Sequence, residues 1–425
     1  MKILHISALP IWSMNGRGGM PSLRETLNGH LREKHEIIFI APEYDLFSDD
    51  LSPIPGVRGS KYGIEIAKCS WLLPLKRFRR HIRKMRESNS LPSPFRWLIN
   101  MSILFFLTVT FLLKAFKVCK KDAFKPDLIY AHNQYSALAG FLLGKLWKVP
   151  NVTRLYGTFL ADLMAKPFVS LRYPTAAAGY LVPSSLLICT NDGTRGDEVA
   201  RKFRISQKRF RFWQNGVEPP SSPPKMTRED FLTRNPKLNI NSKWIVSCSR
   251  LSYWKRIDRM LNALVVCKKE GVDCQLIIAG DGPEKENLQN IAKKSHIEDS
   301  IVWLGAVDHD DIWGLLNVSD VFTITNDVTN RCNPLYEAAW ATLPVVSVKD
   351  PSTSDLLIHG ENALLADKEN PTALGQYLCQ ICRNEKMKEK MKDSQKRLSA
   401  SFWTWEERMK AEVKELEKVI RPLGR

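Results

Sequence analysis

The chain has 425 residues, a length that predicts two domains because single hydrophobic cores stop growing at roughly 250–300 residues. Its 63 basic and 45 acidic residues give a net charge of +18, which favours anionic partners such as nucleotide sugars, nucleic acids or acidic lipid headgroups without choosing among them. The nine cysteines are scattered and Cys379-x-x-Cys382 has no second pair, so neither a zinc site nor a disulfide framework is supported, and a reducing cytoplasm is expected.

The chain opens with an apolar run, residues 2–8, which reads as a first strand rather than an export signal because no charged leader or cleavage site accompanies it. Gly18 and Gly19 lie between this strand and a helix expected over residues 21–34. Small residues there let a ligand approach the backbone, and the helix N-terminus attracts negative charge; an ordinary turn is the alternative. The spacing is not the dinucleotide pattern, and no acidic residue ends the second strand at residues 35–41, so a dehydrogenase is a poor fit.

Two segments raise the question of a membrane. Residues 76–86 are basic with interleaved apolar side chains, as expected of a segment lying on anionic lipid, and residues 97–116 are apolar enough to be read as transmembrane. The strands expected on both sides of 97–116 must join one sheet, which argues against a single crossing. We therefore expect a monotopic protein whose first domain dips into the inner leaflet. The alternative is a buried core helix at 97–116 and a solvated loop at 76–86; residues 43–94 are otherwise expected to be irregular. No recognised motif supports nucleic-acid binding.

Strand-like and helix-like runs alternate through the rest of the first half, which predicts a parallel sheet with crossover helices. The expected strands are 127–132, 151–157, 186–190 and 209–214, with a helix at 137–148. The proline-rich stretch 218–225 reads as a linker, and we place the hinge at 218–242. A first domain would then span 1–217, a second 243–400, and a terminal helix 401–425.

The second half repeats the scheme, with strands near 244–248, 275–279, 301–305, 321–325, 344–348 and 363–366. Arg250 and Lys255 follow the first of these, so they are expected at the carboxyl end of a strand, where two cations suit a diphosphate. Asn333, Pro334 and Leu335 read as a helix start that leaves N–H groups free for an oxyanion. Glu337, one turn further in, can accept hydrogen bonds from sugar hydroxyls.

These segments, with Gly280-Asp281-Gly282-Pro283, resemble the family 4 glycosyltransferases of the GT-B type, and the resemblance runs from residue 1 to about 408. It implies an α/β fold of two Rossmann-like domains facing across a catalytic cleft, with a C-terminal helix crossing back to the first domain. It also implies a retaining sugar transfer. By this resemblance Arg250 and Lys255 hold the donor diphosphate, Glu337 binds the ribose, and Gly18 and Gly19 lie against the donor phosphate. Gly280, Gly282 and, weakly, Val307 belong to the nucleotide site. Each taken alone could be a surface residue or a turn.

Two positions depart from the family pattern. Many members carry a glutamate eight residues before the position of Glu337, where this chain has Thr329, so a carboxylate nucleophile at that place is excluded. Asn330 or Asp327 is a possible replacement for its sugar contacts, or either caps a loop. Relatives often carry a histidine where this chain has Tyr156, and His132 is the nearest spare imidazole. A catalytic role for His132 and a structural, hydrogen-bonded role are both open.

No metal is expected, because the acidic run Asp308-His309-Asp310-Asp311 fits the N-terminus of a helix at 312–318 better than an Asp-x-Asp metal motif. The resulting prediction is a retaining glycosyltransferase that uses a nucleotide-sugar donor and a glycan or lipid-linked acceptor. It would act on the inner face of the cytoplasmic membrane, with surface polysaccharide biosynthesis as a reasonable setting. The alternative is a catalytically silent partner protein that binds nucleotide sugars.

Overall fold

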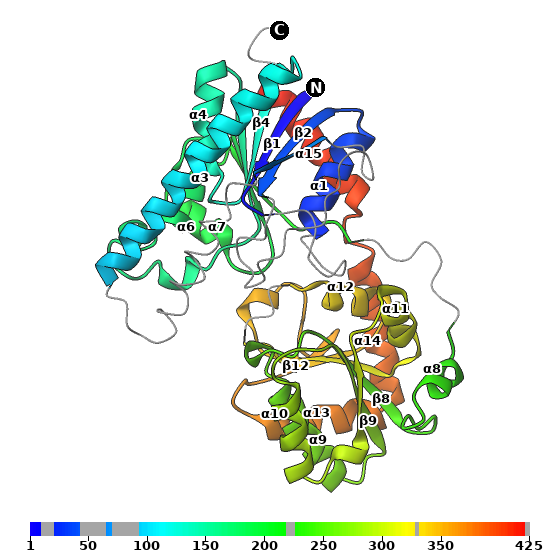
Figure 1. The fold of residues 1–425 in the computed structure, drawn as a ribbon. Helices are drawn as coiled ribbons and strands as arrows, with labels where there is room; N and C mark the ends of the chain where they lie inside the picture. The colour runs from blue at the N-terminus through cyan, green and yellow to red at the C-terminus, as the bar shows by residue number, and fades with distance from the viewer. Residues whose placement is uncertain (10–20, 43–64, 70–92, 218–225, 328–330, 421–425) are drawn as a thin grey trace. The chain divides into compact units, whose positions relative to one another are not determined.

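The computed structural model describes residues 1–9, 21–42, 65–69, 93–217, 226–327 and 331–420 (Figure 1). The chain divides into two compact units, one formed by Met1–Gly216 with Trp403–Arg425 and the other by Val217–Phe402. Each described unit holds a parallel sheet flanked by helices, which confirms the predicted α/β fold with two Rossmann-like halves.

The first unit contains a sheet of seven described strands in the order β3-β2-β1-β4-β5-β6-β7, all parallel. The strands are β1 (Lys2–Ser7), β2 (Glu36–Pro42), β3 (Glu65–Cys69), β4 (Leu128–His132), β5 (Asn151–Leu155), β6 (Leu186–Thr190) and β7 (Phe210–Trp213). Their interior positions are almost entirely buried on both faces, as the continuous apolar runs of parallel strands require.

Helices cover both faces of this sheet (Figure 1). Alternate residues of each strand point to opposite faces. Leu4 and Ile6 of β1 pack in one core with α3 and α4, whereas Ile3 packs in another with α15. The helices of this unit are α1 (Pro21–Arg32), α3 (Ser93–Lys121), α4 (Ala137–Trp147), α5 (Val169–Arg172), α6 (Pro174–Leu181), α7 (Gly196–Lys202) and α15 (Trp405–Ile420), with a 3-10 turn at Ala161–Leu163.

The strand β3 corrects the expectation that residues 43–94 are irregular. Residues Glu65–Cys69 pair with β2 in register, from Ile38 opposite Glu65 to Pro42 opposite Cys69. The strand is short, carries two charged residues and lies at the edge of the described sheet, so its sequence lacks the long apolar run by which the inner strands were recognised.

The second unit contains a sheet of six described strands in the order β10-β9-β8-β11-β12-β13, again parallel. The strands are β8 (Lys243–Cys248), β9 (Cys274–Ala279), β10 (Ile301–Gly305), β11 (Val321–Ile324), β12 (Val345–Val348) and β13 (Ala363–Ala366). The helices are α8 (Arg228–Arg234), α9 (Ile257–Lys269), α10 (Lys285–Lys294), α11 (His309–Val318), α12 (Asn333–Trp340), α13 (Pro371–Arg383) and α14 (Glu385–Ser399), with 3-10 turns at Tyr253–Lys255, Glu298–Ser300 and Pro351–Thr353.

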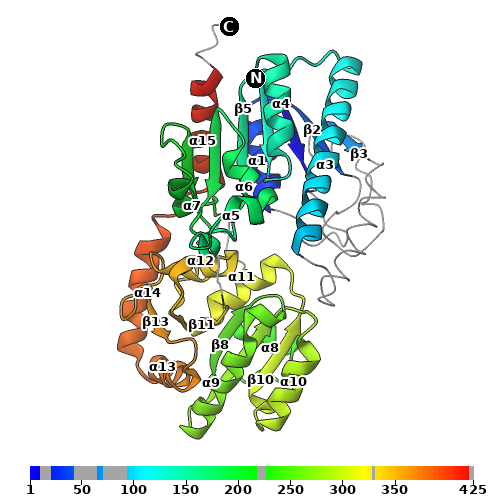
Figure 2. The same ribbon diagram turned by 90° about the vertical axis from the view of Figure 1, so that its left-hand side faces the viewer.

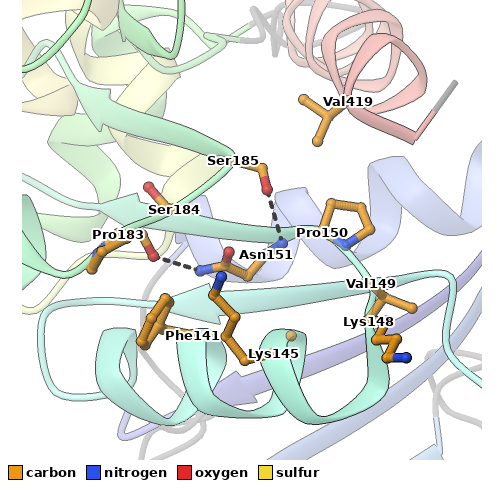
Figure 3. Close-up of a pocket in the computed structure, with 11 residues that line it drawn as sticks. Phe141, Lys145, Lys148, Val149, Pro150, Asn151, Pro183, Ser184, Ser185 and Val419 are labelled. Carbon is orange, nitrogen blue, oxygen red and sulfur yellow. Dashed lines mark hydrogen bonds between the residues drawn. The ribbon is translucent and has the colours of Figure 1, made fainter. Parts of the chain in front are cut away.

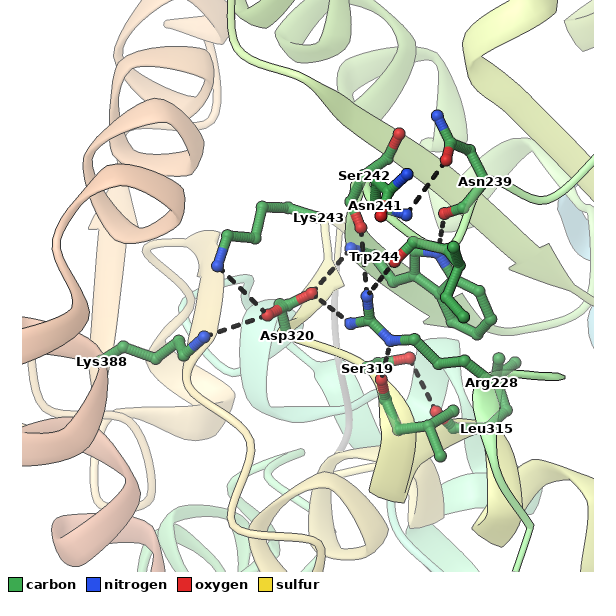
Figure 4. A network of polar contacts seen from close by, with 12 residues as sticks. Arg228, Asn239, Asn241, Ser242, Lys243, Trp244, Leu315, Ser319, Asp320 and Lys388 are labelled. Carbon is green, nitrogen blue, oxygen red and sulfur yellow. Dashed lines mark hydrogen bonds and ion pairs between the residues drawn. The ribbon is translucent and has the colours of Figure 1, made fainter.

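The helix α8 shows that the predicted linker, 218–242, was too long. Thr227 caps α8 in a reciprocal capping box with Asp230, and Phe231 of α8 packs in the core of the second unit beside Trp244. Arg228 donates to Asp320 at 2.6 Å, and Asp320 in turn accepts from the Trp244 N–H at 2.9 Å (Figure 4). Proline density was the signal for a linker, and the proline-rich stretch 218–225 lies outside the described residues; the capping box that follows it was overlooked.

The helix α3 is buried along one side only. Residues Trp97–Lys121 are long and apolar enough to cross a membrane by length and composition, but 39% of the apolar window is buried inside the protein. Leu107 and Phe111 pack in the core above β1, β2 and β4. The strand before α3 and the strand after it, β3 and β4, lie in the same sheet, as the argument against a single crossing assumed. The basic stretch 76–86 lies outside the described residues.

Candidate active site

In the second unit, the residues predicted to bind the donor gather at one edge of the sheet. The strand β8 lies between β9 and β11, and the strand order reverses between β8 and β11. Ligands of such sheets bind outside the carboxyl ends of the strands at that reversal. Arg250 and Lys255 follow the end of β8, and Asn326 follows the end of β11.

Lys255 is the most buried cation of this edge. It ends the 3-10 turn Tyr253–Lys255, is 8% exposed, and has its Nζ 4.0 Å from the centroid of the Trp254 ring. The side-chain oxygen of Asn326, with the amide turned to face the ammonium, accepts from Nζ at 3.2 Å. Burial lowers the pKa of Lys255, and among the described residues no carboxylate forms an ion pair with it. A ligand phosphate would supply the missing negative charge.

Arg250 lies in the exposed loop after β8, and no ion pair joins it to another described residue. Two glycines shape this loop. A Cβ atom on Gly280 would lie 1.8 Å from the carbonyl oxygen of Ser249, and one on Gly282 would lie 2.2 Å from that of Leu251. The N–H of Leu251 donates to the Asp281 carbonyl at 3.0 Å. The two predicted donor-site glycines thus have a packing reason of their own, because they let the loop after β9 support the loop that carries Arg250.

The start of α12 offers fewer donors than the sequence suggested. Asn333 begins the helix, but Pro334 has no N–H, and the N–H of Leu335 donates to the Cys332 carbonyl at 3.0 Å. Of the three predicted positions, Asn333 therefore provides the N–H that can face an oxyanion. This corrects the expectation that all of Asn333–Leu335 presents N–H groups.

Glu337, one turn into α12, is 6% exposed. Burial, together with the negative charge of Glu337, raises the pKa of the Cys248 thiol, which places the carboxylate near the carboxyl end of β8. The helix thus brings Glu337 to the same edge as Arg250 and Lys255. Carboxylates at such an edge accept hydrogen bonds from hydroxyl groups.

Asp327 was one of two possible substitutes for the missing glutamate at position 329. Its carboxylate is already paired, with Arg256 at 3.3 Å and Arg259 at 2.9 Å. The structure therefore supports its alternative role as a residue that anchors a loop. Thr329 and Asn330 lie outside the described residues.

Val307 and the acidic run follow β10. Val307 is partly buried in the core beside Leu304 and Ile312. Asp308 is the N-cap residue of α11, Asp310 and Asp311 lie in its first turn, and Arg234 pairs with Asp311 at 3.0 Å. The run thus begins a helix, as predicted, and its negative charges complement the helix dipole.

In the first unit, His132 occupies the carboxyl end of β4, next to β1, where this sheet also reverses its order. It is fully buried, and both ring nitrogens are engaged: Nε2 lies 2.8 Å from Nδ1 of His5, and Nδ1 lies 2.6 Å from the hydroxyl of Tyr156. A buried imidazole with both nitrogens occupied does not touch a substrate, so the structure favours the hydrogen-bonded alternative over a catalytic one. Gly18 and Gly19 lie outside the described residues.

Sequence reasoning missed the buried ionic cluster around Glu412. This residue of α15 has 0% exposure and pairs with Arg154 of β5 at 2.6 Å and with Arg408 of its own helix at 2.9 Å. Tyr130 donates to its other oxygen at 2.5 Å. Arg154 also donates to Asn215 at 3.3 Å. No sequence signal pairs residues 258 positions apart, although a Glu and an Arg four residues apart on one helix are a local hint.

Burial and charge shift the pKa values of this cluster. Burial alone would raise the pKa of Glu412, but the guanidinium groups of Arg154 and Arg408 hold it well below its usual range. Burial, helped by Arg154, lowers the pKa of His132 well below its usual range, and burial with the neighbouring imidazoles does the same for His5. The carboxylate is thus ionised at neutral pH and the two imidazoles are neutral.

A cavity of about 540 Å³ lies elsewhere in the first unit (Figure 3). It is lined by Lys145 and Lys148 of α4 and its end, by Asn151 at the start of β5 and by Ser184 and Ser185 just before β6. These residues mark the amino ends of the strands, opposite to the edge that carries His132. The cavity therefore does not belong to the candidate site.

Comparisons with known proteins give the same family for the second unit. Residues 229–398 match the model of the glycosyl transferases group 1. An uncharacterised glycosyltransferase of Haemophilus influenzae is 27% identical over 40% of this chain and 48% of its own length. The alpha-monoglucosyldiacylglycerol synthase of Streptococcus pneumoniae is 24% identical over 57% of this chain and 56% of its own. The chain thus spans about half the length of these curated relatives.

Among solved structures, Anabaena HepE in complex with UDP superposes with a TM-score of 0.64 at 16% identity, covering 98% of this chain and 100% of that protein. At this identity the likeness shows the fold, which is the two-domain GT-B fold. The family match covers the strands and loops that carry Arg250, Lys255 and Glu337. By its sequence match and its fold, the chain is a member of the group 1 glycosyl transferases.

Proposed function

We propose that the chain is a retaining glycosyltransferase that moves a sugar from a nucleotide-sugar donor to a glycan or lipid-linked acceptor. The observation that carries the proposal is the pair of cations at the strand reversal of the second unit. Lys255 is buried there without a carboxylate partner among the described residues, and Arg250 follows the same strand. A nucleoside diphosphate satisfies both charges.

These groups act on the leaving group in this proposal. Negative charge grows on the diphosphate as the bond to the sugar breaks, and fixed cations stabilise that charge without having to reorganise. Lys255 is held in place by Asn326 and Trp254, so its charge is oriented before the donor arrives. The N–H of Asn333 and the carboxylate of Glu337 would complete the site by holding a phosphate oxygen and the ribose hydroxyls.

The lipid part of the proposal rests on the outer face of α3. Eight large apolar side chains of this helix are exposed, at spacings that keep most of them on one side: Phe95, Trp97, Leu98, Phe105, Phe106, Val109, Leu113 and Phe116. Phe105 is 70% exposed and Leu113 is 61% exposed. Contiguous apolar faces of this size mark interaction surfaces, and a lipid surface suits a face with few polar groups.

Cations border the end of this apolar face. Lys117, Lys120 and Lys121 are exposed in the last turns of α3. The ring of Phe116 packs edge-on against Trp147 of α4 at 5.3 Å, and Leu146 and Lys148 beside it are exposed (Figure 2 shows α3 next to α4). Each cation near anionic lipid contributes roughly 1 kcal/mol. We therefore place the protein on the inner face of the cytoplasmic membrane, where a lipid-linked acceptor for surface polysaccharide or glycolipid assembly would be found.

A donor screen tests the catalytic part. The purified chain is incubated in detergent with UDP-, GDP-, ADP- and TDP-sugars, with and without lipid acceptors, while thermal stabilisation and release of the nucleoside diphosphate are followed. Stabilisation by one donor with release of its diphosphate, and loss of both in Arg250→Ala but not in Arg201→Ala, is the expected result. Arg201 is an exposed arginine of α7 and serves as the matched control. Binding without release under every condition would contradict the proposal and favour a silent binding protein.

A further inference from the structure

A series of hydrogen-bonding groups crosses the interior of the first unit from Glu412 to Tyr156. Three imidazoles connect them, His30 of α1, His5 of β1 and His132 of β4. Nε2 of His30 lies 3.4 Å from Oε1 of Glu412, and Nδ1 of His30 lies 3.3 Å from Nε2 of His5. Nδ1 of His5 lies 2.8 Å from Nε2 of His132, and Nδ1 of His132 lies 2.6 Å from the Tyr156 hydroxyl. We call these five side chains the histidine chain.

The chemistry of its inner end sets a direction for the histidine chain. An ionised carboxylate only accepts hydrogen bonds, so the nitrogen of His30 that faces Glu412 must carry the proton. A neutral imidazole has one donor and one acceptor nitrogen, so Nδ1 of His30 accepts, and Nε2 of His5 must donate to it. The same step repeats at His132. Each ring is therefore protonated at Nε2, and the outermost acceptor, Nδ1 of His132, receives its proton from the Tyr156 hydroxyl.

The buried charges around Glu412 keep the three rings neutral. One carboxylate faces two guanidinium groups, Arg154 and Arg408, so the cluster already carries an excess of positive charge. An imidazolium in the same interior would add to that excess, which the lowered pKa values of His5 and His132 reflect. A second proton on His5 or His132 would also place two N–H groups against each other.

We propose that Glu412 orients the histidine chain so that the Tyr156 hydroxyl donates inward to His132 and offers its oxygen as a hydrogen-bond acceptor to a hydroxyl group of the substrate. The substrate half of this statement rests on the proposed function. Tyr156 follows the carboxyl end of β5, the edge of the sheet where ligands bind, and its side chain is partly exposed. Thr26, close to the Tyr156 hydroxyl, gives its own proton to the Ser22 carbonyl at 2.7 Å. The outward lone pairs of Tyr156 are thus left for a hydroxyl donor.

The roles within the chain differ. Tyr156 is the group that touches the substrate hydroxyl, whereas His132, His5, His30 and Glu412 act through it and are positioning residues. Sugars and lipid-linked glycans are rich in hydroxyl donors, so an acceptor oxygen at a fixed place selects one hydroxyl over its neighbours. Histidine at position 156 would be able to donate with one nitrogen and accept with the other, and so would preserve the direction of the chain.

The direction can be tested without any substrate, by ¹⁵N NMR of the histidine side chains in the full-length protein at pH 7. Nitrogen shifts distinguish protonated from unprotonated ring nitrogens, and His5, His30 and His132 are assigned by single His→Gln variants. We expect all three in the Nε2-protonated form, both in the parent protein and in Tyr156→Phe, because the direction is set from Glu412. Protonation of any of the three at Nδ1, or a change of tautomer in Tyr156→Phe, would overturn the proposal.

The substrate contact is tested by kinetics with the donor found in the screen. Tyr156→Phe should lower kcat/KM about tenfold, the effect of one net hydrogen bond, whereas Tyr156→His should stay close to the parent value. Tyr377→Phe, the same chemical change on α13 of the other unit, should have no effect. Parent-like kinetics in Tyr156→Phe would overturn the proposal. If the parent protein turns over no donor at all, the proposed function fails and the substrate contact fails with it, while the tautomers still decide the direction of the chain.

Discussion

The two units use the same kind of parallel sheet in opposite ways at the place where the strand order reverses. In the second unit, Lys255 and Arg250 form no ion pair with described residues and are ready for an anion. In the first unit, Arg154 and Arg408 are fully buried and paired with Glu412 before any ligand arrives. Unpaired cations at a strand end indicate a binding site, whereas paired charges under a terminal helix fix structure and orient their neighbours.

The largest expected effect comes from breaking the paired cluster. Glu412→Ala leaves two buried guanidinium groups without their carboxylate, and we expect the free energy of unfolding of the first unit to fall by about 3–5 kcal/mol. Urea denaturation followed by tryptophan fluorescence measures it. The control is Glu415→Ala on the same helix, whose carboxylate pairs near the surface with Arg211 and Lys418 and is worth about 0–1 kcal/mol. Equal losses in both variants would show that burial of the pair adds nothing.

Removing the buried cation of the second unit should affect chemistry rather than stability. Lys255→Ala takes away a fixed charge from the leaving diphosphate, and we expect its release to slow by about 10²–10³-fold, the loss typical of one oriented electrostatic group. Single-turnover assays with the identified donor measure the rate. Lys269→Ala, at an exposed position of α9, should react like the parent protein. A rate for Lys255→Ala within twofold of the parent would remove this lysine from the site.

The outer face of α3 is the third point of comparison, because it is apolar where the candidate sites are polar. The double variant Phe105→Gln, Leu113→Gln should weaken binding to anionic vesicles by about 2–4 kcal/mol, since burying one such side chain contributes about 1.5–3 kcal/mol. Flotation with phosphatidylglycerol vesicles measures the bound fraction. Ile358→Gln changes a 49% exposed apolar residue of the second unit and should leave binding unchanged. Flotation of the double variant at parent levels would show that lipid does not contact this face.

The smallest expected effect is a pH dependence confined to the first unit. The folded-state pKa values of His5 and His132 are depressed, so the unfolded chain binds protons that the folded one does not, and stability falls as pH drops below the unfolded pKa of about 6.5. Between pH 7 and 5.5 each histidine should cost about 1 kcal/mol. The carboxylate of Glu412, with its depressed pKa, keeps its contribution throughout this window. Urea midpoints at the two pH values test this, and His132→Asn should show about half the difference.

Much of the fold followed from local pattern. The inner strands of both sheets were predicted within one or two residues, because buried parallel strands are continuous apolar runs bounded by turn residues. The edge strand β3 and the helix α8 were missed. The first is too short and polar to stand out, and the second follows a proline-rich stretch whose composition suggested that the linker continued.

The candidate donor site was equally local in its signals. Arg250 and Lys255 follow a strand, and Glu337 follows a proline-initiated helix start, so strand ends and helix starts predicted their edge of the sheet. The sequence did not predict that Asp327 is held by two arginines or that Leu335 donates its N–H to Cys332. Both depend on which neighbouring group reaches a polar atom first.

By itself, the sequence determined the class of the chain: two α/β halves, cations at the end of β8, and the resemblance to a family of sugar transferases. These depend on periodicity and on motifs whose residues are close together in the chain. Only the tertiary structure decided that His132 is buried with both nitrogens engaged, and that Glu412 of the last helix pairs with Arg154 of β5. Contacts between residues hundreds of positions apart leave no local pattern, because they arise only when the sheet and its covering helices bring those side chains together.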